Sequence, residues 1–327
     1  MNIEKLKQEF AGKTNHEAYE LAFIKRMLRP NPTEPGTFLG NTQRQEFIPL
    51  LKCLFEKLPR FPQVLDIGAG GGEIVDAALK HLHEATINLV EPNPVLLAKY
   101  QECLRCSSSL REGVSYCGPF QDYYDSSDVQ MPAFEKPQDL ILAIHMLYHF
   151  TDPRSEQIDP DNDLESAVAK MFSFLAPGGF LFIVFANQLV STTGRAGRYY
   201  FSETGRVDVA DRLLEIARSR ERLLGQGEIS KILNERFGPG CTSVESTVTP
   251  SCFYGDNVED IVAMCITAEI GEINEQPFDL RKLDLCGSFV QKHSADIELV
   301  IESRDVPQRG MVRSNQPQIV CVIQRHH

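Results

Sequence analysis

Short apolar runs alternate with amphipathic segments between residues 63 and 186. The runs QVLDI, TINLV, DLILAI and FLFIVFA are too short for buried helices, and VSYCGPF adds a weaker run of the same kind. The segments EIVDAALKHLH, PVLLAKYQECLRC and DLESAVAKMFSFLAPGG carry apolar residues at helical spacing, and we expect Gly178 and Gly179 to end the last helix. Strands that are almost entirely apolar and alternate with helices predict a parallel sheet buried on both faces.

Two helices are predicted before this region, at residues 1–28 and about 43–58. Tyr19, Phe23 and Met27 share one face of the first, and prolines separate it from the second. The first helix could form a lid over a binding pocket, with Tyr19 and Phe23 touching a ligand, or it could simply dock on the sheet.

The remainder of the chain is less regular. We predict a polar, glycine-containing loop at 187–206 and strands in TSVESTVTP and QIVCVIQ. Four further segments have apolar residues at helical spacing and are predicted helices: VADRLLEIARSRERLL, GEISKILNERFG, VEDIVAMCITAEIGEI and DLCGSFVQKHSADIELVIE. The expected organisation is an N-terminal helical lid or substrate region at 1–58, a core at 59–190, and helical insertions with terminal antiparallel strands at 191–327.

The composition narrows the possible partners. The 327 residues carry a formal charge of −12, which disfavours a nucleic-acid substrate because phosphate is repelled. No apolar stretch reaches the roughly 18 residues that span a bilayer, and the N-terminus lacks the apolar core of a signal peptide. We therefore expect no membrane association and a cytoplasmic location.

The cysteines agree with that location. There are nine, scattered along the chain, which is typical of reduced thiols and not of a disulfide framework. Cys103 and Cys106 form a single CxxC without a second pair, and Asp122, Asp125 and Asp128 are interpreted as a polar loop. We therefore expect no metal site.

A glycine-rich turn follows the first apolar run, in VLDIGAGGGEI. Gly68, Gly70 and Gly72 would let the backbone turn sharply and approach a ligand closely. Asp66 precedes them within the strand, where its carboxylate could hold the turn or a ligand ammonium group. By itself the G-x-G-x-G pattern is compatible with a dinucleotide, a nucleoside or no ligand.

Two acidic residues favour a nucleoside cofactor. Glu91 ends the next strand about 20 residues later, where a carboxylate can accept hydrogen bonds from both ribose hydroxyls. Glu73 follows Gly72 at the start of the helix, and its negative charge disfavours a bound phosphate there. A sulfonium compound that carries an amino-acid group is compatible with this turn.

The segments VLDIGAGGGEI, VEPNP, DLILAIHMLYHFTDP and LAPGGFLFIV, over about 62–186, resemble the signature segments of class I S-adenosylmethionine-dependent methyltransferases, in the same order. The resemblance implies an α/β fold: a Rossmann-like seven-stranded methyltransferase sheet flanked by helices, with a helical substrate-covering region. It also implies S-adenosylmethionine as cofactor, bound where the strand order reverses between the first and fourth strands.

Within that class, VEPNPVLLAKYQE, AIHMLYHF, SCFYGDN and a terminal strand preceded by Asn315 resemble the histamine N-methyltransferase-like family. The resemblance places the methionine part at the Gly68 turn, the ribose at Glu91 and the adenine or sulfonium at Ile144. Phe120 and Gln121 stand where family members contact adenine, and Phe120 could equally be an aromatic side chain that fills the edge of the sheet. The acceptor pocket would be lined by His145, Tyr148, Phe253 and Asn315.

This chain departs from that family at the acceptor. It has His145 where the histamine enzyme has glutamine, and it contains no tryptophan. His145 could act as a base, hydrogen-bond the acceptor or be structural. Tyr148 could present its ring face to a cation or only pack in the core. Histamine is therefore not predicted as the substrate.

The favoured function is methyl transfer to a nitrogen of a small amine or imidazole-type molecule by in-line displacement, with His145 and Tyr148 as catalytic candidates. The alternatives are a small-molecule O-methyltransferase and a non-catalytic S-adenosylmethionine-binding regulatory protein. We expect a monomer or a weak homo-oligomer.

Overall fold

The computed structural model describes residues 1–121, 136–267, 274–301 and 312–327, so the predicted polar loop with Asp122, Asp125 and Asp128 lies outside the described residues. Each of its two compact units is assembled from three separate stretches of the chain. Unit 1 comprises 1–46, 186–218 and 249–318, and unit 2 comprises 47–185, 219–248 and 319–327.

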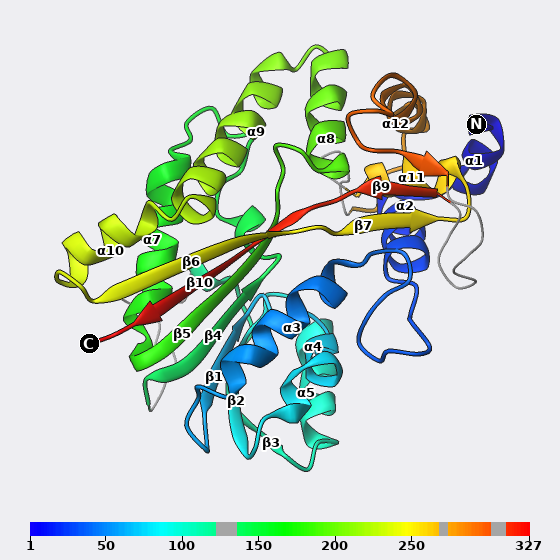
Figure 1. The fold of residues 1–327 in the computed structure, drawn as a ribbon. Coiled ribbons are helices and arrows are strands. Elements are labelled where there is room, and N and C mark those ends of the chain that lie inside the picture. Colours follow the sequence, from blue (N-terminus) through cyan, green and yellow to red (C-terminus); the bar gives the residue numbers. More distant parts are fainter. Residues whose placement is uncertain (122–135, 268–273, 302–311) are drawn as a thin grey trace. The chain divides into compact units, whose positions relative to one another are not determined.

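A seven-stranded sheet with the order β3-β2-β1-β4-β5-β10-β6 forms the centre of unit 2 (Figure 1). The first five strands in this order pair in parallel, and the strand order reverses between β1 and β4. This confirms the predicted Rossmann-like sheet. The strands are β1 (Gln63–Ile67), β2 (Ala85–Val90), β3 (Leu110–Tyr116), β4 (Gln138–Ile144), β5 (Leu175–Ala186), β6 (Thr242–Thr249) and β10 (Gln318–Arg325).

The last two strands form an antiparallel pair at one edge of this sheet. The start of β6 lies beside the end of β10, because the His326 amide donates to the Cys241 carbonyl and the Thr242 hydroxyl donates to the Gln324 carbonyl. Figure 1 shows the two strands running in opposite directions. The sheet therefore ends in an antiparallel strand pair, whose two strands are separated in the chain by β7, β8 and β9.

The sheet is buried on both faces, as the apolar strands predicted. Alternate residues of β4 enter different cores: Leu140 and Leu142 pack with α3, α4 and α5, whereas Ile141 and Ala143 pack with α7 and α10. The same division of helices is visible in Figure 1. The helical elements of this region are α3 (Gln43–Phe55), α4 (Glu73–Ala77), η2 (Leu79–His81), α5 (Pro94–Arg105), η3 (Leu147–His149), α7 (Pro160–Ser173), η4 (Glu221–Gly225) and α10 (Ile229–Phe237).

Helix starts in unit 2 follow from side-chain caps. The Asn93 side chain accepts from the amides of Val95 and Leu96 at the start of α5, and Pro94 occupies the first turn, where its missing N–H costs nothing. At α7 the Asp159 carboxylate accepts from the Asn162 amide in the same way. These caps fix the residue at which each helix begins.

Unit 1 is largely helical and contains a small sheet with the order β7-β9-β8. Its core brings together residues from α1, α2, α11 and α12. A capping box of Thr14 and Glu17 starts α2. The elements are α1 (Ile3–Phe10), α2 (Asn15–Ala22), η1 (Phe23–Met27), α8 (Thr192–Glu203), α9 (Val207–Arg220), α11 (Val258–Cys265), α12 (Arg281–Lys292), β7 (Cys252–Gly255), β8 (Val300–Ile301) and β9 (Val312–Asn315).

Three local predictions were wrong. The expected loop at 187–206 contains helix α8, because the Ser191 side chain accepts from the Gly194 amide and the helix buries Phe201 together with smaller residues. A Cβ at Gly194 would lie 2.2 Å from the Gln188 carbonyl oxygen, so glycine here permits close packing and does not break the helix. Helix α7 also ends at Ser173, earlier than Gly178, which instead lies in an irregular part of β5.

The predicted terminal helix was too long as well. α12 ends at Lys292, and the residues of β8 that follow it are extended.

Candidate functional site

The turn after β1 needs three glycines in the left-handed region, with φ of +67° at Gly68, +62° at Gly70 and +82° at Gly72. A Cβ at Gly68 would lie 2.6 Å from the Met146 Cβ, so this glycine is also required for close packing. At Gly70 the neighbour that such a Cβ would meet, among the described residues, is the Glu73 carboxylate, 3.9 Å away. The turn is therefore packed at Gly68 and open at Gly70, as a turn that receives a ligand must be.

Glu91 fixes the shape of this turn. Its side chain is 5% exposed; Oε2 accepts from the Gly70 amide and Oε1 from the Asn93 amide, both at 2.8 Å. An ionised carboxylate offers about four acceptor positions, so these two bonds leave capacity for two further donors. The geometry suits a carboxylate that holds the turn and can still bind a diol.

Asp66 links β1 to α5. It is 3% exposed, and its Oδ2 accepts from the Tyr100 hydroxyl at 2.9 Å. Burial, followed by the nearby Asp66 charge, raises the pKa of Tyr100 well above its ordinary value. The structure thus gives Asp66 a supporting contact behind the glycine turn, and its contact with the cofactor stays a prediction.

The three residues predicted beside adenine or the sulfonium lie in two places of unit 2: Phe120 and Gln121 are consecutive after β3, and Ile144 is at the end of β4. Phe120 is buried, with ring centroids 6.3 Å from Phe150 and 6.4 Å from Phe174. Gln121 donates from Nε2 to the His149 carbonyl at 2.9 Å and so ties the segment after β3 to the turn after β4. Ile144 is the last residue of β4 and pairs with Val184. Their contacts with a cofactor stay predictions.

The turn after β4 contains both catalytic candidates. His145 has φ of +54°, unusual for a residue with a side chain, and its amide donates to the Val184 carbonyl at 2.7 Å. Its Nδ1 lies 3.3 Å from the Tyr148 hydroxyl, and its ring meets Phe47 edge-on at a centroid distance of 6.4 Å. The structure therefore brings His145 and Tyr148 together, with the imidazole held on two sides.

Sequence reasoning missed Arg220, the last residue of α9, which belongs to unit 2 although most of the helix belongs to unit 1. It is 5% exposed; Nη2 donates to the Leu147 carbonyl at 3.1 Å, and its guanidinium carbon lies 5.2 Å from the centroid of the Tyr148 ring. A signal was present, because Arg220 falls at i+3 and i+4 from Ala217 and Ile216 on the apolar face of the helix. A charged residue on the apolar face of a helix is expected to be buried and to need a hydrogen-bond or aromatic partner.

A sequence model of the methyltransferase-domain family matches residues 40–223, which is more than half of the chain and includes both turns. The chain belongs to this methyltransferase family. S-adenosylmethionine is accordingly the cofactor, as the sequence predicted. The open turn at Gly70 and the spare acceptor capacity of Glu91 fit that molecule.

Solved structures that resemble this methyltransferase have low sequence identity. BH2331 of Bacillus halodurans C-125, assigned provisionally as a methyltransferase, is 13% identical, covers 87% of this chain and 99% of its own, and has a TM-score of 0.49. YcgJ of Bacillus subtilis is 11% identical over 86% and 98%, with a TM-score of 0.48. The plantazolicin methyltransferase BpumL, solved with SAH, is 15% identical over 100% and 98%, with a TM-score of 0.43.

At these TM-scores the similarities say nothing about the acceptor. None of the curated proteins matches this methyltransferase.

Two acceptor candidates lie together on the helical part of unit 1. The rings of Tyr19 and Phe23 stack with centroids 5.1 Å apart, and burial raises the pKa of Tyr19. This stacking fits either a lid or a docked helix, so both interpretations of the first helical region stay predictions.

The other two candidates lie on adjacent strands of the small sheet. Phe253 is fully buried in the core of unit 1 and pairs with Ser314. Asn315 pairs with Cys252 and donates from Nδ2 to the Glu298 carboxylate at 3.3 Å. Their contact with the acceptor stays a prediction.

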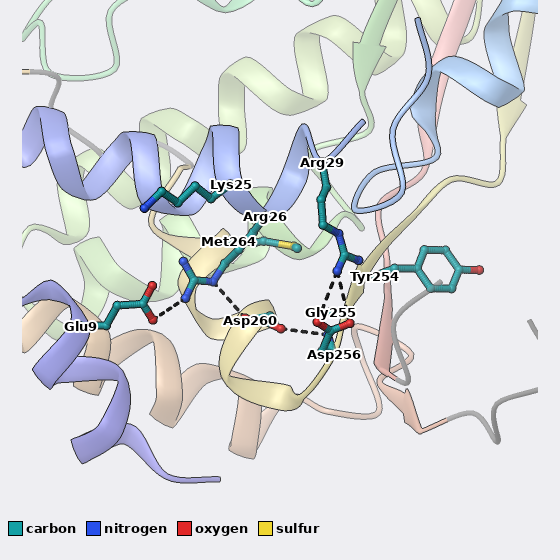
Figure 2. A pocket seen from close by; sticks show the side chains of 9 residues that line it. All are labelled: Glu9, Lys25, Arg26, Arg29, Tyr254, Gly255, Asp256, Asp260 and Met264. Carbon is teal, nitrogen blue, oxygen red and sulfur yellow. Dashed lines mark hydrogen bonds and ion pairs between the residues drawn. The ribbon is translucent and has the colours of Figure 1, made fainter. Parts of the chain in front are cut away.

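A hollow in unit 1 is lined by ion pairs (Figure 2). Arg26 contacts Glu9 at 2.7 Å and Asp260 at 3.0 Å, and Arg29 contacts Asp256 at 3.2 Å. The Asp256 amide also donates to the Asp260 carboxylate. Because these charges neutralise one another, the hollow is interpreted as a structural ion-pair network, and no ligand is assigned to it.

Among the residues that the structure describes, no three histidine, cysteine or acidic side chains gather as a metal site. No described helix is both long enough and apolar enough to cross a membrane. The cytoplasmic location and the oligomeric state stay predictions.

Proposed function

We propose that this methyltransferase transfers the methyl group of S-adenosylmethionine to a nitrogen of a small amine or imidazole-type acceptor by in-line displacement. The observation that supports the proposal is the juxtaposition of two turns on neighbouring strands: the Glu91-anchored glycine turn after β1, and the His145 turn after β4. The glycine turn and Glu91 would bind a nucleoside cofactor. His145 and Tyr148, in the turn after β4, would form hydrogen bonds with an acceptor.

The glycine turn and Glu91 are the residues we assign to the cofactor. The carboxylate of Glu91 would accept from the ribose hydroxyls, since each of its oxygens already has one fixed donor and a defined orientation. The methionine part would lie along the open side of Gly70. When bound, S-adenosylmethionine supplies a methyl group already activated on a sulfonium.

His145 and Tyr148 are assigned to the acceptor. An amine can attack only when it is neutral, so the site must hold the nitrogen without its proton and aim its lone pair along the S–C axis. The hydroxyl of Tyr148, 3.3 Å from His145 Nδ1, keeps the imidazole in one orientation. A held imidazole can accept a hydrogen bond from the acceptor N–H and can receive the proton that the product releases.

An O-methyltransferase is the second candidate, and the same contact favours it. A phenol or alcohol must lose its proton as it attacks, which requires a base in a fixed position. His145 is held by its backbone, by Tyr148 and by Phe47, so it could serve as that base.

The test is a turnover assay with methyl-labelled S-adenosylmethionine and matched panels of small amines, imidazoles and phenols. The proposal expects label on an amine or imidazole nitrogen, and expects His145→Gln to reduce turnover while leaving cofactor binding by calorimetry unchanged. Label on phenols alone would support the second candidate. Cofactor binding without methylation of either panel would contradict both and favour a regulatory role.

A further inference from the structure

The end of α9 changes its helical geometry at Arg220. The residues that follow, η4 (Glu221–Gly225), form a π-helical turn closed by the Gln226 amide donating to the Glu221 carbonyl. A π turn contains an extra residue, costs stability and occurs frequently at functional sites. Here it lets Leu223 and Leu224 enter the core while Arg222 points outward to Asp161 and Glu228.

Arg220 itself is directed inward, onto the turn after β4. Its guanidinium touches that turn in two ways, through the hydrogen bond to the Leu147 carbonyl and through the face of the Tyr148 ring. A planar guanidinium is suited to this combination, because it can donate in its plane while an aromatic ring stacks against it. A lysine could not make both contacts with the same geometry.

The contacts continue to His145. Tyr148 has its ring against Arg220 and its hydroxyl 3.3 Å from His145 Nδ1, and the two aromatic planes are inclined by 18°. Fixing the Tyr148 ring therefore fixes the hydroxyl that orients the imidazole. Because His145 also has a positive φ, its side-chain direction depends on such neighbours more than on ordinary backbone preference.

We propose that Arg220 is a positioning residue for the acceptor side of the reaction, which holds Tyr148 and through it the imidazole of His145. The proposal rests on the proposed function in assigning the acceptor to these two residues. The positioning itself can be measured without any acceptor, so the two claims can fail separately.

The first measurement is the imidazole ¹⁵N spectrum of the full-length protein with labelled histidine, with His145→Gln identifying the His145 signals. Arg220→Ala should shift or broaden these signals, since Tyr148 loses its support. Tyr148→Phe should affect the same signals by removing the hydroxyl while keeping the ring. Arg222→Ala is the matched control: it removes an arginine two residues away that faces outward, and it should leave the signals unchanged.

The second measurement is the effect on turnover, with whichever acceptor the labelled panels identify. A small misplacement in an active site can reduce the rate by about a hundredfold, so Arg220→Ala should lower kcat by about tenfold to a hundredfold. Cofactor affinity should stay within about twofold, because the contacts described for Arg220 are with Leu147 and Tyr148 in the turn after β4, on the acceptor side. Arg220→Lys should recover only part of kcat.

Unchanged His145 signals in Arg220→Ala would overturn the proposal, as would an equal change in Arg222→Ala. If Arg220→Ala does not fold, Arg220→Lys and Tyr148→Phe decide: coincident changes in the His145 signals support the positioning role, and unchanged signals in both refute it. If Arg220→Ala alters the His145 signals but the protein methylates no acceptor, the positioning role of Arg220 is supported and the proposed function is refuted.

Discussion

Two turns at the ends of neighbouring parallel strands meet the same backbone requirement with different residues. After β1 the left-handed positions are glycines 68, 70 and 72, whereas after β4 the left-handed position is His145. A side chain in this region costs about 1–2 kcal/mol, a cost that glycine avoids. The turn after β1 therefore requires only a left-handed backbone conformation, which glycine adopts without strain. The turn after β4 keeps the histidine side chain although the same conformation strains it.

The two turns also contact each other. The space that a Cβ at Gly68 would need is occupied by Met146, the residue after His145. A change in the glycine turn therefore alters the support of the histidine turn as well. Different side chains support the two turns. The hydrogen bond from Tyr100 to Asp66 supports the glycine turn, and the hydrogen bond from Arg220 to the Leu147 carbonyl supports the turn that contains His145.

The largest effect should come from Gly68→Ala compared with Gly70→Ala. Both place a side chain at positive φ, but only the first drives a Cβ into Met146, at 2.6 Å. We expect Gly68→Ala to lower the free energy of unfolding by about 2–4 kcal/mol and Gly70→Ala by about 1 kcal/mol. Denaturant titration measures both. Equal losses would show that the packing between the turns contributes nothing.

Gly70→Ala should have its main effect on the ligand, because its Cβ projects into the open side of the turn. Calorimetry should therefore show weaker S-adenosylmethionine binding in this variant, in a protein that is still folded. Full affinity would place the cofactor elsewhere.

The next largest effect is expected from Glu91→Ala. Removing a buried carboxylate that orders Gly70, and that we assign to the ribose, should weaken cofactor binding by about 1–3 kcal/mol, the scale of hydrogen bonds to charged groups. Glu102→Ala, which removes an exposed carboxylate from α5, is the control for net charge. If the two variants bound the cofactor equally well, the ribose assignment would be refuted.

A smaller effect with a defined pH dependence is expected from Tyr100→Phe. Near neutral pH the loss of the hydrogen bond to Asp66 should lower the free energy of unfolding by about 1–2 kcal/mol. The folded-state pKa of Tyr100 is raised well above 10, whereas an unfolded tyrosine loses its proton near 10. Above pH 10 the unfolded wild type therefore binds fewer protons, and its stability falls as pH rises.

Phenylalanine has no such proton, so the stability difference between wild type and Tyr100→Phe should shrink above about pH 10. Urea titrations at pH 8 and at several values above 10 measure it. A difference that stays constant with pH would mean that Tyr100 titrates equally in both states.

The glycine turn could be predicted from the sequence because its requirements are local. Three glycines followed by a helix, and an acid at the end of the next apolar run, specify a backbone shape and one carboxylate without knowledge of distant contacts. The sheet was predictable for the same reason, since strands buried on both faces are apolar throughout. Helix α8 was missed because Gly194 permits close packing against the backbone of Gln188, six residues earlier, whereas a glycine among polar residues was interpreted as a loop signal.

The histidine turn was only partly predictable. His145 and Tyr148 stand three residues apart, and their contact follows from the turn between them. Arg220 lies more than 70 residues further along the chain, and only the fold brings it onto the Tyr148 ring. The sequence suggested that the Tyr148 ring could bind a cationic ligand. In the structure, one face of this ring is covered by the guanidinium of Arg220.

The smallest effect, and the most direct test of the difference between the turns, is His145→Gly compared with His145→Ala. Both remove the imidazole, but only glycine relieves the strain at φ of +54°. We expect His145→Gly to be the more stable of the two by about 1 kcal/mol in thermal and chemical unfolding, while both lose turnover equally. Equal stabilities would show that the backbone relaxes without glycine. Turnover retained in both variants would show that the strained position does not serve the reaction, and that His145 is kept there for packing against Phe47 and Tyr148.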